Sequence, residues 1–390
     1  MPRIRSVETV VLAVDADDPY LGVLPSGDRP PSDRYFRRPP WRSLYSSRFE
    51  TLLVRLECDD GSYGWGEALA PVAPEVPAAV VRHLLAPVLL ESDPRESAVL
   101  RVRLSDLMRE RGHLGGHQAD ALAAVDFALW DLTGKLAGEP IAGLLGGPFR
   151  TRLPVYVSGL PRPDDEGRAA LAAEWAERGA TAVKLALGYG VVADLATVDA
   201  VQAAAPGLRV GVDAHWAYDL AAALRLGRGL DVRRGWFLEA PLVPEDVAAH
   251  AELAAALDTP VAIGEALRHR WEFRPFVDGR AVDLCQPDVA RTGITEAVAI
   301  IDYAEAHHLR VAPHHSTGMG VALAAGLHVA AARSSVEVFE YQPGTFPVAN
   351  ALLVDPIAGD AAHLKLPTGP GLGVDVDDSR LAGAERTVIS

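Results

Sequence analysis

The fold is decided between residues 208 and 265, where three short segments share one pattern: LRVGVDAHW (208–216), GWFLEAP (235–241) and PVAIGE (260–265). Each segment begins with apolar residues and reaches a single acid, at Asp213, Glu239 and Glu265. A short apolar run that ends in turn residues is typical of a buried strand. Ala-rich stretches lie between the three segments, so the repeating unit is a strand followed by a helix.

The same unit recurs on both sides of these segments, over residues 151–342. Strands that alternate with helices pair in parallel through right-handed crossovers, and eight of them predict a closed α/β barrel of the TIM type. An open, doubly wound sheet is the competing interpretation, but the chain lacks the Gly-rich phosphate-binding patterns found in many such sheets. The eight predicted strands are 153–159, 180–187, 208–214, 235–240, 260–265, 281–287, 309–314 and 335–341.

The regions before and after the predicted barrel have a different character. Residues 3–14 are predicted as a strand, and Asp59-Asp60-Gly61 predicts a hairpin turn between strands 49–57 and 62–66. Helical spacing follows at 76–90, 94–110 and 117–137, and Gly146-Gly147-Pro148 then breaks the chain. We therefore predict three parts: an N-terminal domain at 1–150, the barrel at 151–342, and a tail at 343–390 that returns to the N-terminal domain.

Composition limits the class of protein. The chain has 390 residues, 49% of them hydrophobic, and a formal net charge of −15, which argues against disorder and against nucleic-acid binding. Cys58 and Cys285 match no metal spacing and are too few for a disulfide scaffold. With neither a secretory signal nor a membrane-spanning segment in the sequence, we expect a soluble, acidic enzyme of the cytoplasm.

A polar residue lies at the C-terminal end of each of seven consecutive predicted strands. The intervals between them are 29, 26, 26, 23, 27 and 25 residues, about the length of one strand–helix unit. Because the carboxyl ends of barrel strands form the active site in this fold, we expect these side chains to converge. They are Lys184, Asp213, Glu239, Glu265, Asp288, His315 and Glu340.

Asp213, Glu239 and Glu265 form the first candidate site. Three carboxylates at close range repel one another unless a cation compensates them. Hard oxygen ligands suit Mg²⁺, so the pattern predicts a magnesium site. The alternative for any one acid is a local cap or ion pair at its own strand end.

Two histidines are candidates for proton transfer. His315 with Asp288 forms a predicted pair in which the carboxylate fixes the tautomer and raises the basicity of the imidazole, as suits a general base. The neighbouring His314 leaves open that either histidine is only a hydrogen-bonded structural residue. His215 lies two residues after Asp213 and so on the same face of a strand, as a proton donor, a substrate contact or a structural residue.

Taken together, these segments resemble the enolase superfamily and, within it, the mandelate racemase subgroup. Further matching segments are VKLA (183–186), QPD (286–288), PHH (313–315), FEY (339–341), GWGE (64–67) and ALWD (128–131). The resemblance implies a modified (β/α)₇β barrel under an α+β capping domain that the N-terminal region and the C-terminal tail build. It also implies Mg²⁺ on Asp213, Glu239 and Glu265, and the His315–Asp288 dyad as the base, in line with the known use of a Lys or His base with Mg²⁺ in this superfamily.

The chain departs from the racemase pattern at Ala186. The racemase-like motif is Lys-x-Lys with its second Lys as a base, and Lys184 matches only the first, supporting Lys. A His two residues after the first metal ligand, without the second Lys, resembles the galactonate dehydratase type of acid-sugar dehydratase. In that type the base corresponding to His315 removes the C2 proton, and the residue corresponding to His215 protonates the departing 3-hydroxyl.

The resemblance therefore implies a lyase that converts a sugar acid to its 2-keto-3-deoxy acid. Glu340, if it is protonated, is expected to hydrogen-bond the substrate carboxylate or its developing oxyanion. A one-base racemase or epimerase, or another lyase on a related carboxylate, is the alternative, and a non-catalytic metal-binding protein is a third. We expect a homo-oligomer, because the family is commonly oligomeric, and neither a nucleic acid nor a membrane as a partner.

The substrate is expected to contact the loop at 15–47, which is dense in Pro, Arg, Asp, Ser and Tyr. Long loops in compact domains are often functional, and arginines suit a polyhydroxy acid or a second carboxylate. The alternative for each arginine is a solvated charge. The candidates are Arg29, Arg34, Tyr35, Arg37 and Arg38.

Overall fold

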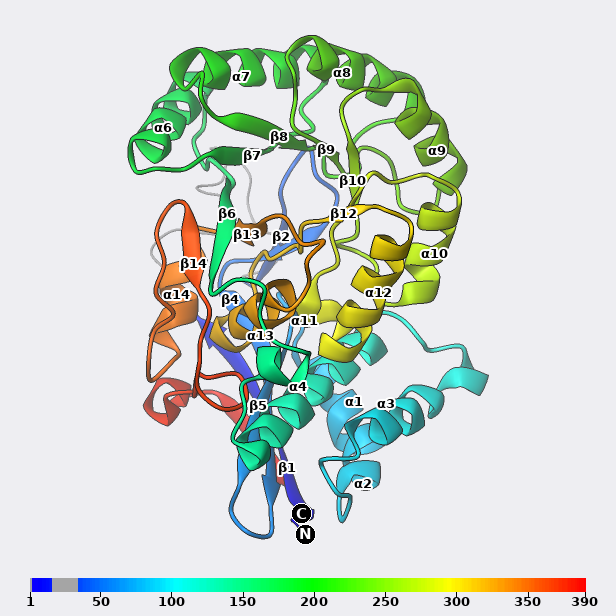
Figure 1. The fold of residues 1–390 in the computed structure, drawn as a ribbon, viewed down its shortest axis with the longest axis vertical. Coiled ribbons are helices and arrows are strands. Elements are labelled where there is room, and N and C mark those ends of the chain that lie inside the picture. Colours follow the sequence, from blue (N-terminus) through cyan, green and yellow to red (C-terminus); the bar gives the residue numbers. More distant parts are fainter. Residues whose placement is uncertain (1, 16–33) are drawn as a thin grey trace.

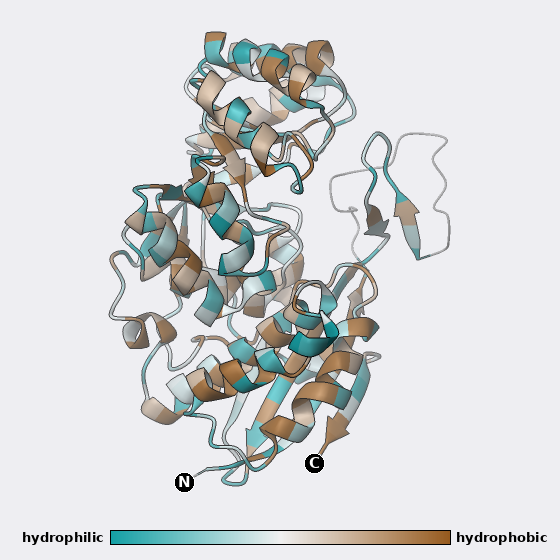
Figure 2. Ribbon diagram, turned by 90° about the vertical axis from the view of Figure 1, so that its right-hand side faces the viewer, coloured by the Kyte–Doolittle hydropathy of each residue, from teal (hydrophilic) through white to brown (hydrophobic). Residues whose placement is uncertain are grey.

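The computed structural model describes residues 2–15 and 34–390, and it contains a barrel and a capping domain (Figure 1). The candidate residue Arg29 lies outside the described residues. The barrel occupies the upper part of Figure 1, and the capping domain and both chain ends lie below it. Along both parts, the helices alternate between hydrophobic and hydrophilic residues (Figure 2), as expected of helices that bury one face.

The capping domain is built on an antiparallel sheet with the strand order β15-β1-β4-β5. As predicted, β4 and β5 form a hairpin around Asp59-Asp60-Gly61, where Gly61 has a φ of 85°. This left-handed conformation is open to glycine without steric cost. The strands are β1 (Ile4–Val14), β4 (Phe49–Cys58), β5 (Tyr63–Ala68) and β15 (Glu385–Ile389).

The long helix α4 (His117–Ala137) covers this sheet, and its close approach explains the glycines of the GWGE motif. A Cβ atom at Gly66 would lie 1.8 Å from the carbonyl oxygen of Ala124, and one at Gly64 would lie 2.4 Å from that of Ala128. The region predicted as one helix at 76–90 is helical but contains a π-helical turn at Val81–Leu85. The other helical segments of the cap are α1 (Glu75–Val80), α2 (Ala86–Leu89), α3 (Ser97–Asp106), a 3-10 turn at Arg109–Arg111 and α5 (Ile141–Leu144).

All eight predicted barrel strands are present, and they pair in parallel in the order β12-β11-β10-β9-β8-β7-β6-β13. The barrel closes between β12 and the segment before β13, because Val311 N donates to Ser335 O and Glu337 N donates to Val311 O. This closure rules out the open sheet. The strands are β6 (Arg152–Ser158), β7 (Ala182–Ala186), β8 (Arg209–Asp213), β9 (Leu238–Glu239), β10 (Val261–Ile263), β11 (Leu284–Cys285), β12 (Arg310–Val311) and β13 (Phe339–Tyr341).

Helices follow the first seven of these strands, which is the predicted (β/α)₇β arrangement. The interior of the barrel is filled by buried side chains from most of the strands, among them Tyr156, Phe237 and Leu284. Its lining is therefore a packed core, as in other barrels of this type. The helices are α6 (Asp165–Glu177), α7 (Val191–Ala204), α8 (Leu220–Val232), α9 (Val247–Ala256), α10 (Arg270–Asp278), α11 (Val289–Thr292), α12 (Ile294–Ala306) and α13 (Gly320–Ala331).

The tail after β13 contacts both parts of the molecule. It contains α14 (Phe346–Ala351) and β14 (His363–Lys365), and β14 pairs antiparallel with β6 of the barrel. The last strand, β15, then pairs with β1 of the cap. The boundaries at 150 and 342 remain a prediction.

A small hairpin of β2 (Tyr35–Arg37) and β3 (Leu44–Ser46) belongs to the predicted functional loop. Its connection reaches the barrel, because the indole Nε1 of Trp41 donates to Leu187 O, just after β7, at 2.7 Å. This contact places the loop beside the carboxyl ends of the barrel strands.

The structure bears on the predictions about disulfides and membrane-spanning segments. Both Cys58 and Cys285 are buried and free, so neither forms a disulfide with the other. Over residues 2–15 and 34–390, no helix combines the length and the apolar character that crossing a membrane requires.

Glu67 of β5 joins the cap to the barrel. Its carboxylate, which is fully buried, accepts hydrogen bonds from Met319 N (2.6 Å) and Ala322 N (2.8 Å) at the start of α13, and from the hydroxyl of Thr51 (2.9 Å). A carboxylate is favourable at the N-terminal end of a helix. Burial nevertheless raises the pKa of Glu67 to about 7, although the donors oppose this shift.

We predict that Glu67→Gln removes a part of the pH dependence of stability. The folded protein holds a proton on Glu67 at pH values where the unfolded chain, with an ordinary pKa near 4.5, does not. The wild type should therefore gain about 2.5 kcal/mol relative to the variant as the pH falls from 8 to 5. Thermal unfolding across this range measures the difference, with the exposed Glu177→Gln as the control, and parallel curves for wild type and Glu67→Gln would contradict the assignment.

Candidate active site

The C-terminal ends of the barrel strands bring the predicted strand-end residues to one mouth. Lys184 lies within β7, Asp213 and Glu239 end β8 and β9, and Glu265 follows β10 by two residues. Asp288 follows β11, and Glu340 lies in β13. Asp213 and Glu239 are direct partners in the register of β8 and β9, which places two of the acids side by side.

Lys184 is the central cation of this mouth. Its Nζ atom lies 2.9 Å from Glu239 Oε1 and 2.8 Å from Glu340 Oε1, and all three side chains are at least 95% buried. Gln286 Nε2 donates to the second oxygen of Glu239 at 2.7 Å. Lys184 and Gln286 therefore hold the Glu239 carboxylate from two sides.

Burial and mutual repulsion perturb the acids in opposite directions. Burial raises the pKa of Asp213 and of Glu239, and their acidic neighbours add to this effect while Lys184 opposes it. Burial also acts to raise the pKa of Glu265, but the hydrogen bond from His314 and its charge outweigh burial, so the pKa of Glu265 is lowered. Raised pKa values at adjacent carboxylates indicate that the protein supplies too little positive charge to neutralise them.

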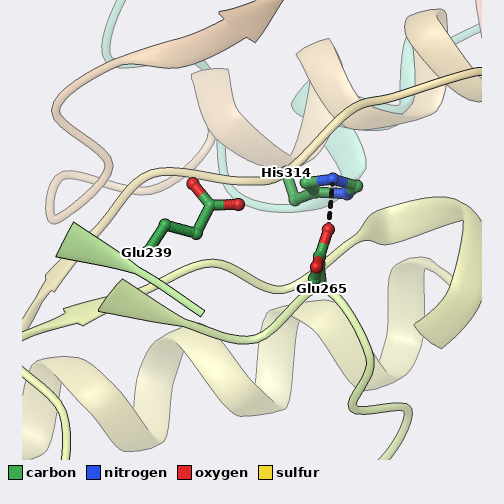
Figure 3. A group of neighbouring side chains, drawn as sticks. All are labelled: Glu239, Glu265 and His314. Atoms are coloured by element: carbon green, nitrogen blue, oxygen red, sulfur yellow. Dashed lines mark ion pairs between the residues drawn. The ribbon is translucent and has the colours of Figure 1, made fainter. Parts of the chain in front are cut away.

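The donor atoms present here fit a divalent cation. Glu239, Glu265 and His314 each offer a ligand atom within 4.8 Å of the other two (Figure 3). Asp213 lies next to Glu239, is also buried, and supplies a further carboxylate. A set of carboxylate oxygens is the donor chemistry that Mg²⁺ prefers, whereas a His nitrogen suits softer metals better. We therefore favour the three acids over His314 as the metal ligands.

His314, not His315, pairs with Asp288. His314 Nδ1 lies 2.7 Å from Asp288 Oδ2, and Nε2, on the opposite side of the ring, lies 3.0 Å from Glu265 Oε2. Figure 3 shows the ring of His314 turned toward Glu265. Burial lowers the pKa of His314, but Glu340, Asp288 and Glu265 outweigh it and hold that pKa well above its ordinary value.

The predicted pair of His315 and Asp288 is therefore wrong. His315 uses its backbone N–H to bind Glu340 (2.9 Å), and its ring packs 5.6 Å from that of Phe339, where burial lowers its pKa to about 4. Successive side chains of an extended segment point to opposite sides, so only one of the two histidines can face Asp288. The backbone bridge between Asp288 and His314 selects His314.

Spacing alone contained a weak signal for this choice. His314 lies 26 residues after Asp288 and 26 before Glu340, the same interval that separates Asp213, Glu239 and Glu265. The intervals of 27 and 25 residues that His315 gives are also compatible with helices and loops of variable length. The spacing therefore could not distinguish His314 from His315.

His215 reaches the mouth by a route that strand alternation did not predict. The strand ends at Asp213, and His215 has a φ of 48°, in the left-handed region. Its Nδ1 lies 3.2 Å from Asp213 Oδ1 without the geometry of a hydrogen bond, and its ring stacks on Trp41 with centroids 4.0 Å apart. Burial lowers the pKa of His215 to about 4.

Glu340 is bound differently from the expectation. Burial acts to raise its pKa, but Lys184 and His314 outweigh burial and lower it. The carboxylate is thus ionised and already accepts from Lys184 and from His315 N. An ionised carboxylate has no proton to donate, so a hydrogen bond from Glu340 to the substrate stays a prediction that requires Glu340 to be protonated.

The four predicted substrate-binding residues within the described chain separate into two groups. Arg34 pairs with Glu50 and Glu75, both at 2.7 Å, and Tyr35 donates to Glu50 at 3.0 Å, so both are engaged within the cap. Arg37 is exposed on β2. Arg38 is buried and reaches a pocket at the barrel mouth.

Sequence reasoning did not select Trp41 and Tyr45, which cover the mouth. Both line a cavity of about 180 Å³ together with His215 and Trp216. Burial raises the pKa of Tyr45, and the charges of Asp213, Glu265 and Tyr189 raise it further, while Arg38 opposes them. The only available signal was the high density of aromatic residues in the 35–45 stretch.

Comparison with known proteins agrees with this architecture. Residues 37–146 match the family model described as mandelate racemase / muconate lactonizing enzyme, N-terminal domain. Residues 167–380 match the one described as enolase C-terminal domain-like, so the two together cover most of the chain.

Individual relatives align over nearly their full lengths. The chain is 35% identical over 354 residues to a D-galactarolactone cycloisomerase of Agrobacterium fabrum, covering 87% of this chain and 92% of that protein. It is 32% identical over 362 residues to a D-galactonate dehydratase of Ralstonia nicotianae, covering 86% and 91%. A solved structure of an enolase superfamily member from Agrobacterium tumefaciens superposes with a TM-score of 0.94 at 34% identity, covering 99% of this chain and 100% of that one.

Both the family models and the full-length relatives thus confirm the resemblance that the strand-end motifs indicated: the chain belongs to the mandelate racemase subgroup of the enolase superfamily and is an enzyme of that superfamily.

Proposed function

We propose that this enzyme is a Mg²⁺-dependent lyase that removes the proton next to the carboxylate of a sugar acid and expels the oxygen substituent on the following carbon. The observation that carries the proposal is the orientation of His314. One ring nitrogen is held by Asp288, and the other faces the carboxylates of the mouth. Relatives named for acid-sugar dehydration and cycloisomerisation support the same class of reaction.

Asp213, Glu239 and Glu265 would hold the magnesium ion and, through it, the substrate carboxylate. When bound there, Mg²⁺ supplies Lewis-acid stabilisation of the charge that develops on the substrate. Lys184 adds a fixed positive charge beside Glu239, inside a site that is largely closed to water. Such prearranged charges are worth more in a buried site than in water.

Without a cation, His314 is the charged partner of Glu265. With a divalent cation on the three acids, Glu265 would no longer hold a proton on Nε2, and His314 would act as the base, with Asp288 keeping Nδ1 protonated so that Nε2 can accept the substrate proton. The imidazolium formed in this step is stabilised by the same carboxylate. With Ala186 at the position of a second Lys and Lys184 tied to two glutamates, a two-base racemisation has no second base on that strand. His215, on the Trp41 side of the mouth, is the candidate to protonate the leaving oxygen.

Cycloisomerisation of a sugar lactone is the second candidate, and the 35% identical cycloisomerase relative favours it. Both reactions begin with loss of the proton next to a carboxylate. They differ in the leaving group, which is a hydroxyl in dehydration and the ring oxygen in lactone opening.

The exchange of His314 for Asn tests the proposed base. Proton NMR in D₂O with Mg²⁺, over a panel of five- and six-carbon aldonates, aldarates and their lactones, follows loss of the C2 proton and the appearance of C3 methylene signals. His314→Asn should slow C2 exchange by about 10²–10⁴-fold, because a positioned base contributes that much. His315→Asn, the matched control, should keep exchange within tenfold if it unfolds at the wild-type temperature, and the reverse pattern would restore His315 as the base.

A second variant separates elimination from proton removal. His215→Asn should retain C2 exchange but lose C3 methylene formation by about 10²-fold or more on a hydroxyl leaving group. Elimination at close to the wild-type rate would assign His215 as a substrate contact only.

Magnesium binding has a readout that does not depend on turnover. Addition of Mg²⁺ should raise the thermal midpoint of the wild type, since a ligand at 100 times its Kd stabilises by about 2.7 kcal/mol. Glu265→Gln should weaken Mg²⁺ binding by more than about tenfold, because even a residue that only orients a metal ligand is worth that much. Glu337→Gln, an exposed acid before β13, is the control, and an equal Mg²⁺ response of both variants would contradict the site.

A further inference from the structure

The ring of His215 is not fixed by a hydrogen bond at Nδ1. This atom lies 3.2 Å from Asp213 Oδ1, but that oxygen already accepts the backbone N–H of His215 at 3.0 Å. Over the described parts of the chain, Nδ1 of His215 has no hydrogen-bond partner. The ring also borders the cavity of about 180 Å³. His215 therefore differs from His314, whose Nδ1 is held by Asp288.

The backbone fixes where the side chain of His215 begins. His215 and Trp216 have φ values of 48° and 53°, both in the left-handed region, and Trp216 N donates to Ala240 O at 2.7 Å. Non-glycine residues keep this conformation only where the surrounding structure enforces it. The χ2 torsion of a histidine has only broad minima, however, so contacts with neighbouring groups decide where the ring points.

The indole of Trp41 is the contact that restricts the ring of His215. The two rings are nearly parallel, with an angle of 10° between them and centroids 4.0 Å apart. Trp41 is only 6% exposed, so its indole is itself packed and cannot turn aside easily. A flat ring at this distance blocks every orientation of the imidazole that would tilt through it.

The indole has a fixed place on the barrel. Its Nε1 atom donates to Leu187 O at 2.7 Å, and Leu187 N donates to Asp213 O at 2.8 Å. The buried carboxylate of Asp194 accepts a hydrogen bond from Gly188 N at 3.1 Å, which holds the segment after β7 in place. Trp41 is therefore bound to the same strand end from which His215 projects.

His314 is supported by other elements. Its ring lies against Asp288, Glu265 and Glu340, which are all in or directly after barrel strands. The ring contact of His215 comes instead from the connection between β2 and β3. The two histidines of the proposed reaction are thus held by different parts of the molecule.

We propose that Trp41 is a positioning residue for His215: it holds the imidazole where its proton reaches the oxygen that leaves the substrate. As this oxygen takes the proton, its bond to carbon breaks and the electron pair of that bond leaves with it, while the electrons left at C2 form the double bond. The hairpin of β2 and β3 thereby controls elimination but not removal of the C2 proton. This inference rests on the proposed function, because it assumes that His215 acts on the leaving oxygen.

Two substitutions of Trp41 separate stacking from anchoring. Trp41→Phe keeps a flat ring against His215 and loses the N–H that binds Leu187 O, whereas Trp41→Leu loses both. Proton NMR in D₂O with the Mg²⁺-loaded protein records C2 exchange and C3 methylene formation on the same acid. Trp41→Leu should slow elimination by about 10–10²-fold, because a small misplacement of a reacting group costs that much, and should leave C2 exchange at the wild-type rate. Trp41→Phe should retain more elimination than Trp41→Leu.

A double-mutant cycle with His215→Asn shows whether Trp41 acts through the imidazole. In the His215→Asn protein, Trp41→Leu should cause no further loss of elimination, since the effects of coupled residues do not add. A further loss as large as that in the wild type would assign Trp41 to direct contact with the substrate and overturn the proposal. Equal losses of C2 exchange and of elimination in Trp41→Leu would also overturn it.

The direction of the His215 ring has a readout that does not require turnover. The ring current of the stacked indole should shift the His215 ring protons upfield in spectra of histidine-labelled protein, and His215→Asn identifies the signal by its loss. Trp41→Leu should move this signal downfield. An unchanged signal would overturn the proposal, whatever the activity of the variant.

Trp271→Leu is the matched control. Trp271 also stacks on a histidine, His269, with centroids 5.0 Å apart, but it does not line the cavity beside His215. This variant should change neither rate nor the His215 signal. The proposed function fails separately: if no acid or lactone of the panel exchanges its C2 proton while Trp41→Leu still moves the His215 signal, the ring contact stands, and the lyase reaction and the role of Trp41 in it do not.

Discussion

The buried ion pairs of Lys184 are the interaction on which the rest of the site depends. Its ammonium group lies between Glu239 and Glu340, and it is the cation at the centre of the barrel mouth. Removing one partner of a buried pair costs about 3–5 kcal/mol, because the other charge is left without compensation. The pairs therefore hold β7, β9 and β13 in a geometry that keeps several acids close together, and this crowding favours a divalent cation.

The cap takes part in this geometry through Glu67, not only through the loop above the mouth. Glu67 binds the first turn of α13, and the segment that leads into this turn contains His314 and His315. A carboxylate of the capping domain thus fixes the end of the barrel loop that contains His314, the proposed base. Gly64 and Gly66 allow β5 to pack closely on α4. This packing fixes the position of Glu67 relative to α13.

Much of the architecture was predictable, because it depends on local patterns. The alternation of apolar runs with helical stretches predicted all eight strands and the closed barrel, and the Asp59-Asp60-Gly61 turn predicted the hairpin. The even spacing of Lys184, Asp213, Glu239, Glu265 and Asp288 placed them at one end of the barrel. The predicted strands were longer than the observed ones, since apolar residues continue into the turns that follow.

The sequence by itself determined the fold and the set of residue types at the barrel mouth, because periodicity and spacing depend only on the repeat of one strand–helix unit. The tertiary structure alone decided that His314 faces Asp288, that Glu340 is ionised against Lys184, and that Arg38 but not Arg34 reaches the mouth. These outcomes depend on the direction in which a side chain leaves the backbone and on charges contributed by other strands. A shift of one residue changes that direction completely while it leaves the sequence pattern almost the same.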